Sequence, residues 1–294
     1  MKKNLIICAV QQPCNRGREV NLAYSLAQIA AAAARGADLV VLPELHLDHY
    51  FCQNEDTAAF DLAQAIPGPT CEQLSEAAKT HQVIIVSTLF EKRAPGLYHN
   101  TAVVFDKDGS LAGKFRKMHI PDDPGFYEKF YFTPGDLGFT PITTSLGKLG
   151  VLICWDQWYP EAARLMALAG AEILIYPTAI GWNPHDDVAE KQRQLDAWRT
   201  IQRGHAVANG IPVVACNRIG FEASPDHGDG IDFWGNSFIA GPQGEILAAA
   251  GHNQDILLFA ELHGARIEEV RRIWPFLRDR RIDAYQDLNR RYLD

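Results

Sequence analysis

A carboxylate, an amine and a thiol in this sequence could together form a site for covalent hydrolysis. Each closes a predicted strand, and they are Glu44, Lys117 and Cys154. Reactive groups in α/β sheets gather beyond the carboxyl ends of the strands, so residues far apart in sequence can meet there. A thiol needs a base or a cationic neighbour to become a good nucleophile, and the other two residues supply one of each. The three positions therefore favour attack by a cysteine on an electrophilic carbon.

The segment that holds the thiol, residues 147–168, has the pattern of a strand, a tight turn and a helix. An apolar run predicts a strand over 149–153, with Cys154 at the point where the run stops. Pro160 suits the first turn of a helix because its missing N–H would be unpaired there, and Glu161 suits the positive end of the helix dipole. We expect backbone N–H groups of the turn to face the thiol of Cys154 and to favour its thiolate.

The other predicted elements follow one plan twice. Each half of the chain has the order strand, helix, strand, helix and then three strands. In the first half we expect strands over 5–10, 39–42, 83–90, 101–105 and 111–115, with helices over 21–34 and 71–80. In the second half we expect strands over 149–153, 172–176, 213–215, 237–240 and 245–249, with helices over 161–169 and 188–209. The repetition predicts two similar sheets packed together with helices outside, a single layered α/β unit.

Composition argues against several classes of protein. With 294 residues, 47% of them hydrophobic, the chain can bury a large core. Its net charge of −8 and its scattered Lys and Arg argue against a nucleic-acid surface and mildly favour cationic small molecules. No apolar stretch approaches the roughly 20 residues that span a bilayer. We interpret the short apolar run near the start as a strand rather than a signal peptide.

The spacing of cysteines and histidines bears on compartment and cofactors. Six cysteines without a C-x-x-C pair or a secretory signal favour reduced thiols, and so a cytoplasmic protein. The histidines form no H-E-x-x-H or comparable metal-binding pair. A mechanism that uses Cys, Glu and Lys does not require a metal ion. We therefore expect no metal, no other cofactor, and no nucleic-acid or membrane partner.

Three segments of the chain resemble a known family. LPEL around Glu44, GKFRKMHIP around Lys117 and LICWDQWYPEAAR around Cys154 are similar to the signature segments of the carbon–nitrogen hydrolase (nitrilase) superfamily. The resemblance covers nearly the whole chain and implies a single domain over 1–294. It also implies a four-layer α-β-β-α sandwich, in agreement with the two-sheet plan. Glu128, in GFYEKFYF, matches the position of a second glutamate that orients the lysine in this family.

The resemblance implies a role for each of these residues. Glu44 would take the proton of Cys154, pass it to the leaving nitrogen and later activate a water molecule. Lys117 would stabilise the thiolate and the oxyanion of the tetrahedral intermediate. The backbone N–H of Trp155 would be a second oxyanion donor, a contribution worth about 3–4 kcal/mol in a known hydrolase.

Within the superfamily, the segments are most similar to enzymes that hydrolyse N-carbamoylputrescine on the agmatine route to polyamines. Putrescine, carbon dioxide and ammonia would be the products, and either nitrogen could depart first. Relatives that act on N-carbamoyl amino acids can carry an arginine just after the nucleophile to hold a carboxylate, whereas this chain has Gln157 and Trp158 there. We therefore expect a cationic ureide as the substrate.

An ammonium group needs carboxylate or aromatic partners. We predict that Asp186 and Asp187 bind it, with Asp122 and Asp123 as alternative acids. Aromatic walls would come from Tyr50, Trp155 and Trp158, and also from Trp182.

Two alternative functions stay open. The same triad could act on an N-carbamoyl amino acid, a small aliphatic amide or a nitrile. A nucleotide- or ligand-binding protein with a structural Cys154 would instead need a Gly-rich phosphate loop after the first strand. The sequence there is QQPCNRG, which lacks the G-x-G-x-x-G pattern.

The last stretch, residues 274–294, is polar and rich in arginine. It could be a solvated tail. The family suggests an arm that packs on a partner subunit, and we favour a homo-oligomer, either a dimer or a multiple of dimers.

Overall fold

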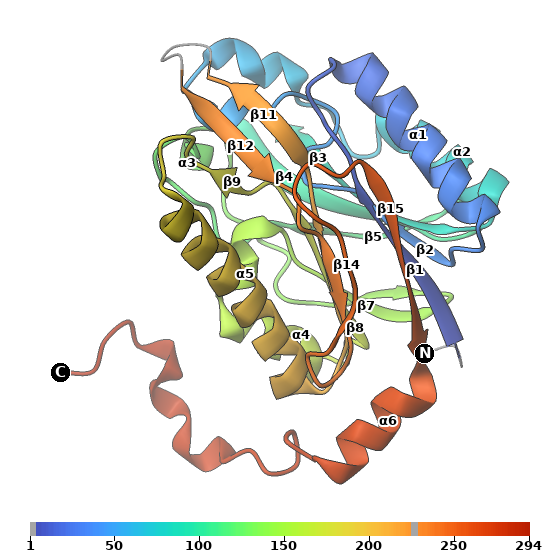
Figure 1. Cartoon of the computed structure of the whole chain (residues 1–294), viewed down its shortest axis with the longest axis vertical. Coiled ribbons are helices and arrows are strands. Elements are labelled where there is room, and N and C mark those ends of the chain that lie inside the picture. The colour runs from blue at the N-terminus through green and yellow to red at the C-terminus, as the bar shows by residue number, and fades with distance from the viewer. Residues whose placement is uncertain (1–3, 225–228) are drawn as a thin grey trace.

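Two six-stranded sheets lie face to face within residues 4–224 and 229–294, the part of the chain that the computed structural model describes. Figure 1 shows two helices on the outer side of each sheet. On the first sheet these are α1 (Arg18–Ala34) and α2 (Pro69–His81), and on the second α4 (Pro160–Leu168) and α5 (Val188–Asn209). The four-layer α-β-β-α sandwich predicted from the sequence is confirmed.

The first sheet has the order β15-β1-β2-β3-β4-β5. Its strands are β1 (Asn4–Gln11), β2 (Leu39–Val41), β3 (Ile84–Ala94), β4 (Leu97–Phe105), β5 (Leu111–Arg116) and β15 (Ile256–His263). The second sheet has the order β14-β13-β10-β8-β7-β6. Its strands are β6 (Ile142–Thr144), β7 (Gly147–Val151), β8 (Ile173–Thr178), β10 (Val213–Asn217), β13 (Phe238–Ala240) and β14 (Ile246–Ala249).

Both sheets share one pairing pattern. Three parallel strands form the centre of each, β1-β2-β3 in the first and β7-β8-β10 in the second. Each trio is flanked by one antiparallel strand on one side, β15 or β6, and by two on the other. The repeated plan read from the sequence therefore describes the structure, with one further strand added to each sheet.

Local sequence accounts for the ends of several helices. Pro160 is the first residue of α4, as predicted, and Pro69 is the first residue of α2. The side chain of Asp187 accepts a hydrogen bond from the backbone N–H of Glu190 and so caps the start of α5. That helix ends at Asn209, and Gly210 follows it with a φ of 60°, which is left-handed and favours glycine.

Apolar side chains fill the space between the sheets and the space under α1 and α2. The larger cluster joins inward-facing residues of both sheets, among them Ile7, Val86, Val151 and Ile175. These strands are buried on both faces, so their runs are continuously apolar rather than alternating. The rigid strand ends carry the loops that hold the predicted catalytic residues.

Several elements differ from the sequence prediction. β7 ends at Val151, and Cys154 begins a 3-10 turn, η3 (Cys154–Trp158), so the prediction that the strand runs to 153 is wrong. The edge strands β6 and β15 were not predicted. A small third sheet of β11 (Ile219–Ala223), β12 (Gly230–Trp234) and β9 (Gly181–Trp182) was not predicted either.

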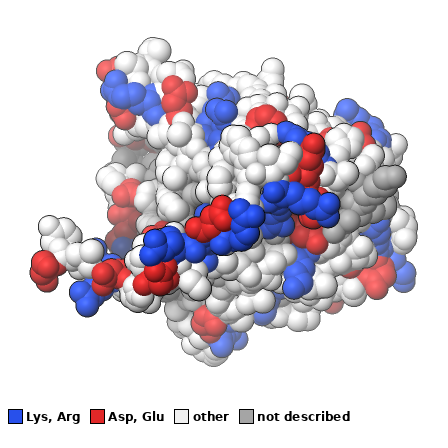
Figure 2. All heavy atoms as spheres, turned by 90° about the horizontal axis from the view of Figure 1, so that it is seen from below, with Lys and Arg blue, Asp and Glu red and all other residues white. Residues whose placement is uncertain are grey.

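The chain after β15 forms α6 (Gly264–Ile273) and then two short 3-10 turns, η4 (Ile282–Ala284) and η5 (Gln286–Asn289). Figure 1 shows this segment running beneath the sandwich and ending away from it. Figure 2, seen from below, shows Lys and Arg mixed with Asp and Glu along it. Within the described residues, no helix is both long and apolar enough to cross a membrane.

Candidate active site

Four side chains from four loops meet in one buried site. Glu44 follows β2, Lys117 follows β5, and Cys154 begins the turn after β7. Glu128 begins the short helix α3 (Glu128–Tyr131). Glu44, Lys117 and Glu128 are fully buried, and Cys154 is 4% exposed. The structure thus brings together all four residues that the sequence analysis proposed as catalytic.

Lys117 lies between the two carboxylates. Its Nζ donates to Glu44 Oε1 over 2.8 Å and to Glu128 Oε2 over 2.6 Å. Burial opposes the charge of Lys117, but the carboxylates of Glu128 and Glu44 outweigh burial and raise the pKa of the amine well above its usual value. Lys117 therefore remains a cation and can stabilise negative charge that develops beside it.

The two carboxylates differ in how their oxygens are used. Glu128 has a donor on each oxygen, because the Tyr50 hydroxyl donates to Oε1 over 2.7 Å and Lys117 donates to Oε2. Glu44 receives both of its donors on Oε1, from Lys117 and from the Asn100 side-chain amide at 2.7 Å. Its Oε2 is buried and has no hydrogen-bond partner among the described residues. Glu44 can thus accept a further proton, while Glu128 is fully occupied in holding Lys117.

Burial also sets the proton distribution of the site. It raises the pKa of Glu128 to about 7, although Lys117 acts in the opposite direction. Burial likewise raises the pKa of the Cys154 thiol well above its usual value, the Glu44 carboxylate adds to this effect, and Lys117 opposes it. From the sequence, backbone N–H groups of the turn are expected to favour the thiolate, whereas burial of the site favours the thiol. Proton transfer from the thiol would therefore accompany attack rather than precede it.

The nucleophile candidate has an unusual backbone conformation. Cys154 has φ of 44°, in the left-handed region that residues other than glycine seldom adopt. Its Sγ lies 3.8 Å from the carbonyl oxygen of Ala179, in the loop after β8. Such a conformation persists only where surrounding contacts fix it, and the turn after β7 supplies several of these contacts.

A pocket of about 410 Å³ opens onto this site. Cys154 and Glu128 lie in its wall together with tryptophans, other apolar groups and two aspartates. Its lining residues are Pro121, Asp123, Pro124, Phe126, Glu128, Cys154, Trp155, Trp158, Ala179, Ile180, Gly181, Asn183, Asp186, Gln194, Ala197 and Trp234. None of these lining residues, all within the described part of the chain, is a lysine or an arginine.

The predicted substrate-binding residues divide into two groups. Trp155, Trp158 and Asp186 line the pocket, and the carboxylate of Asp186 accepts a hydrogen bond from Gln194. Asp187 has a different role from the predicted one, since it is exposed, lies outside the lining and caps α5. Tyr50 is also placed differently, because it is fully buried and contacts Glu128 rather than forming a wall.

The sequence of the chain matches a known family along most of its length. The family model described as carbon-nitrogen hydrolase matches residues 7–272. This chain belongs to the carbon–nitrogen hydrolase family. The resemblance drawn from the three segments is therefore confirmed, and the chain is an enzyme of that family.

Individual relatives of this carbon–nitrogen hydrolase cover almost its whole length. It is 44% identical over 285 residues to N-carbamoylputrescine amidase of Solanum lycopersicum. The alignment covers 96% of this chain and 94% of the relative. It is 40% identical over 291 residues to citrullinase of Francisella tularensis subsp. tularensis. The alignment covers 98% of this chain and 99% of the citrullinase. The crystal structure of a carbon-nitrogen hydrolase from Helicobacter pylori superposes with a TM-score of 0.96 at 54% identity, covering 99% of this chain and 100% of that one.

Sequence reasoning missed one residue in contact with the catalytic candidates. Asn100 lies in β4 and donates to Glu44, and it belongs to a buried polar run, His99 to Thr101. Three adjacent polar residues at the start of an otherwise apolar strand were the available signal. Asn183 and Gln194, which line the pocket of this hydrolase, carry no such signal because both belong to polar segments.

Proposed function

We propose that this enzyme hydrolyses N-carbamoylputrescine to putrescine, carbon dioxide and ammonia. The observation that carries the proposal is the composition of the pocket that holds Cys154. Besides Glu128, two aspartates, Asp123 and Asp186, line the pocket, and none of the described lining residues is a lysine or an arginine. A substrate with a ureido group at one end and an ammonium at the other suits such a pocket, and aromatic walls suit the methylene chain between them. The similarity to a plant N-carbamoylputrescine amidase supports the same substrate.

The proposed reaction begins with the thiol. Cys154 Sγ attacks the ureido carbon while its proton moves to Glu44, whose Oε2 has no other partner. Negative charge then collects on the former carbonyl oxygen, where Lys117 and the backbone N–H of Trp155 stabilise it. Glu44 returns the proton to one of the two nitrogens, and the bond from carbon to that nitrogen breaks.

Hydrolysis of the acyl-enzyme uses the same residues, with water as the nucleophile and Cys154 as the leaving group. Glu44 takes a proton from a water molecule, and the water oxygen attacks the thioester carbon. The carbon–sulfur bond breaks and the proton returns to Cys154. The released carbamic acid decomposes to carbon dioxide and the remaining amine or ammonia, so the products are the same whichever nitrogen leaves first.

The main alternative keeps the chemistry and changes the far end of the substrate. Citrulline and N-carbamoyl amino acids also carry a ureido group. An N-carbamoyl amino acid ends in a carboxylate, and citrulline ends in a carboxylate beside an ammonium, so both need a cation that N-carbamoylputrescine does not need. Similarity to a citrullinase makes citrulline a necessary comparison. The pocket lining favours the amine because its only charged side chains, within the described residues, are carboxylates. Small amides and nitriles remain further substrates to test.

A substrate panel tests the proposal directly. Purified enzyme is incubated with N-carbamoylputrescine, citrulline and N-carbamoyl-β-alanine, and released ammonia, putrescine, ornithine and β-alanine are measured. We expect putrescine from the first compound and at least tenfold lower kcat/KM for the other two, since each misplaced charge costs a factor of ten or more. The Cys154→Ala variant is the matched control and should release nothing. Preferential hydrolysis of citrulline would overturn the choice of substrate but leave the thiol chemistry in place.

The cellular setting is also a proposal. Putrescine release would place the enzyme on the agmatine route to polyamines. All six cysteines are buried, unpaired thiols, which suits a reducing compartment, and we propose the cytoplasm.

We infer further that the enzyme is a homo-oligomer built from one hydrolase domain with a C-terminal arm, residues 274–294. The matched family segment ends at residue 272, just before this arm. Apolar side chains along the arm are strongly exposed, including Trp274, Leu288 and Tyr292. Exposed apolar groups in series are a feature of surfaces that bind another protein.

A further inference from the structure

The proposed catalytic residues stand on different sheets. Lys117 follows β5 of the first sheet, and Cys154 follows β7 of the second. Their separation is therefore fixed by how the two loops contact each other rather than by a shared strand ladder. One side chain, that of Asp156, forms polar contacts with both loops.

Asp156 lies in the nucleophile turn and reaches His119, two residues beyond Lys117. Its Oδ1 accepts a hydrogen bond from the backbone N–H of His119 over 2.9 Å and lies 2.7 Å from His119 Nδ1. Its Oδ2 accepts from the backbone N–H of Ile153 over 3.0 Å. A carboxylate only accepts, so Nδ1 carries the proton in this contact.

The surroundings hold the pair in one arrangement. The side chain of Asp156 is fully buried, and that of His119 is 29% exposed. The ring of His119 stacks on Tyr159 with centroids 3.7 Å apart and planes 5° apart. Tyr159 follows the turn η3 directly, so the ring contacts the nucleophile segment through both its edge and its face.

The same carboxylate closes the turn around Cys154. The backbone N–H of Asp156 donates to the carbonyl of Ile153, while its side chain accepts from the N–H of that residue. Cys154 lies between these two residues with its left-handed φ of 44°. Loss of the carboxylate would release both the strained turn and the contact with the lysine loop.

We propose that Asp156 and His119 are a positioning pair that fixes the lysine loop against the nucleophile turn. Neither residue lines the pocket, so both act through Lys117 and Cys154 rather than on substrate. This inference rests on the proposed hydrolytic function for its kinetic readout. A shift of about 1 Å between reacting groups can cost a hundredfold in rate.

A double-mutant cycle tests the pair. In Asp156→Asn, one carboxylate oxygen becomes an NH₂ group, which faces an N–H donor and cannot accept its hydrogen bond. His119→Phe keeps the stack on Tyr159 but removes the Nδ1 donor. We expect each variant to lower kcat about tenfold to a hundredfold, with KM changed less than about twofold. The double variant should lose no more kcat than the more impaired of the two single variants, because both changes remove the same interaction. Losses that multiply independently, or that fall on KM alone, would overturn the proposal.

A second comparison covers the case in which Asp156→Asn fails to fold. The side-chain amide nitrogen of asparagine can occupy the place of His119 Nδ1, so His119→Asn should retain the hydrogen bond without the aromatic stack. We expect kcat of His119→Asn within about threefold of the wild type and well above that of His119→Phe. The reverse order would show that the stack alone matters and would overturn the proposed hydrogen bond.

Alkylation of Cys154 by iodoacetamide separates this inference from the choice of substrate. The rate is followed by intact mass, with Cys154→Ala as the blank, and it should fall in the positioning variants even if no tested ureide is hydrolysed. An unchanged rate would contradict the pair. Wild-type alkylation without ureide hydrolysis would instead overturn the proposed function alone.

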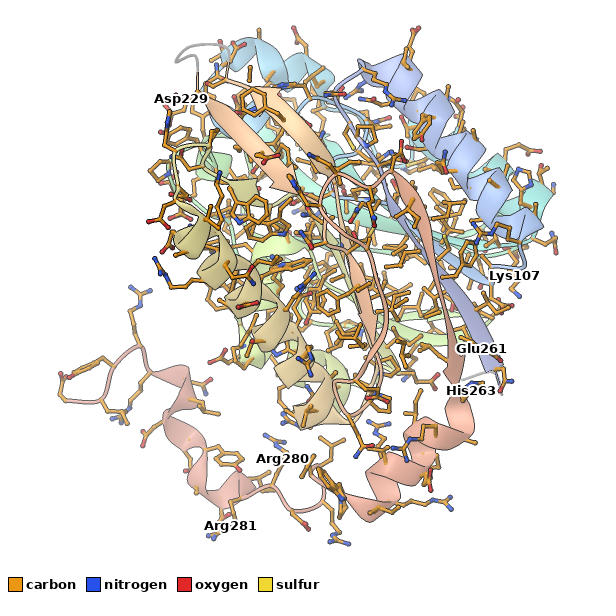
Figure 3. The ribbon with its side chains drawn as sticks, in the orientation of Figure 1. Lys107, Asp229, Glu261, His263, Arg280 and Arg281 are labelled. Atoms are coloured by element: carbon orange, nitrogen blue, oxygen red, sulfur yellow. The ribbon has the colours of Figure 1, made fainter. Side chains whose placement is uncertain are left out.

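An exposed histidine–carboxylate pair supplies the matched control. Figure 3 labels Glu261 and His263 together at the end of β15 beside α6, and their side chains lie 3.7 Å apart. Glu261→Gln and His263→Phe repeat the same chemical changes on the surface. We expect both to leave kcat and the alkylation rate unchanged, because surface ion pairs contribute little.

Discussion

The Tyr50 hydroxyl donates a hydrogen bond of 2.7 Å to Glu128 Oε1, and both side chains are fully buried. Burial raises the pKa of Glu128 to about 7, while Lys117 and this hydroxyl stabilise its charge. The Tyr50→Phe variant removes one of these donors, so the pKa should rise further. If ionised Glu128 is needed to hold Lys117, the acidic limb of the kcat/KM profile should move up by about one pH unit. Initial rates between pH 5 and 9 check this.

Tyr131→Phe is the control for the lost hydroxyl. Tyr131 lies in the same aromatic cluster, but its hydroxyl bonds the backbone of Asn54 and Asp56 rather than a carboxylate. This variant should unfold at a lower temperature without moving the acidic limb. Equal shifts in both variants would mean that Tyr50 acts through packing.

Glu44 gives a prediction about the chemical step. Glu44→Gln keeps an acceptor for Lys117 and Asn100 but removes the base at Oε2. We expect kcat to fall by about 10²- to 10⁴-fold with little change in KM. Single-turnover measurement of acyl-enzyme formation, with thermal unfolding as the check on folding, tests this. A rate within tenfold of the wild type would exclude Glu44 as the base.

The ends of strands are the part of the site that sequence predicts well. Buried strands read as continuous apolar runs, and a charged residue directly after such a run is easy to locate. Glu44 is found in this way, and Lys117 is found at the end of the mixed strand β5. β5 pairs antiparallel with β4, and β4 pairs antiparallel with β3, so β5 runs in the same direction as the parallel trio and the loops of both residues lie at one edge of the sheet. Cys154 is located too, but its left-handed turn is not, because no glycine marks it.

The placement of Tyr50 depends on contacts that sequence does not display. Its backbone N–H donates to Glu222 over 2.6 Å, across 172 positions of the chain. No local pattern predicts such a contact. Asp187 is different, because Asp187 and Glu190 form a D-x-x-E pattern typical of a helix start. That pattern predicts a helix cap, which is the role that Asp187 has in the structure.

Glu91 gives a prediction about stability. Its carboxylate bonds Lys114 and Arg116 at the end of β5, directly before Lys117. Burial would raise its pKa, but the hydrogen bonds from Arg116 and Lys114 outweigh burial and lower the pKa to about 2. A depressed folded-state pKa gives stabilisation that is present above the unfolded value, near pH 4.5, and is lost as the pH falls toward 2.

Glu91→Gln should therefore lower the free energy of unfolding at pH 7 by on the order of 3 kcal/mol. The difference from the wild type should shrink markedly at pH 3. Urea denaturation at the two pH values measures both quantities. A difference that is the same at pH 7 and pH 3 would show that the loss comes from packing rather than from charge.

The C-terminal arm gives a prediction about assembly. Trp274 is 50% exposed, Leu288 64% and Tyr292 80%, which is costly for a free chain in water. The full chain should have a mass in solution of two chains of 32.7 kDa or a multiple of that dimer mass. Deletion of the residues after Trp274 should reduce that mass toward a single chain, as measured by light scattering. An unchanged mass would leave the arm as a solvated tail.

Asp186 gives the sharpest prediction about substrate choice, because its neighbour is a matched control. Asp186→Asn should raise KM for N-carbamoylputrescine about tenfold, the value of one lost charge pair in a partly buried pocket, and should leave KM for the neutral analogue butylurea unchanged. Asp187→Asn removes an equal charge outside the pocket and should spare both constants, since asparagine also caps helices well. If the two variants behave alike, the amine end binds elsewhere, with Asp123 the next acid to change.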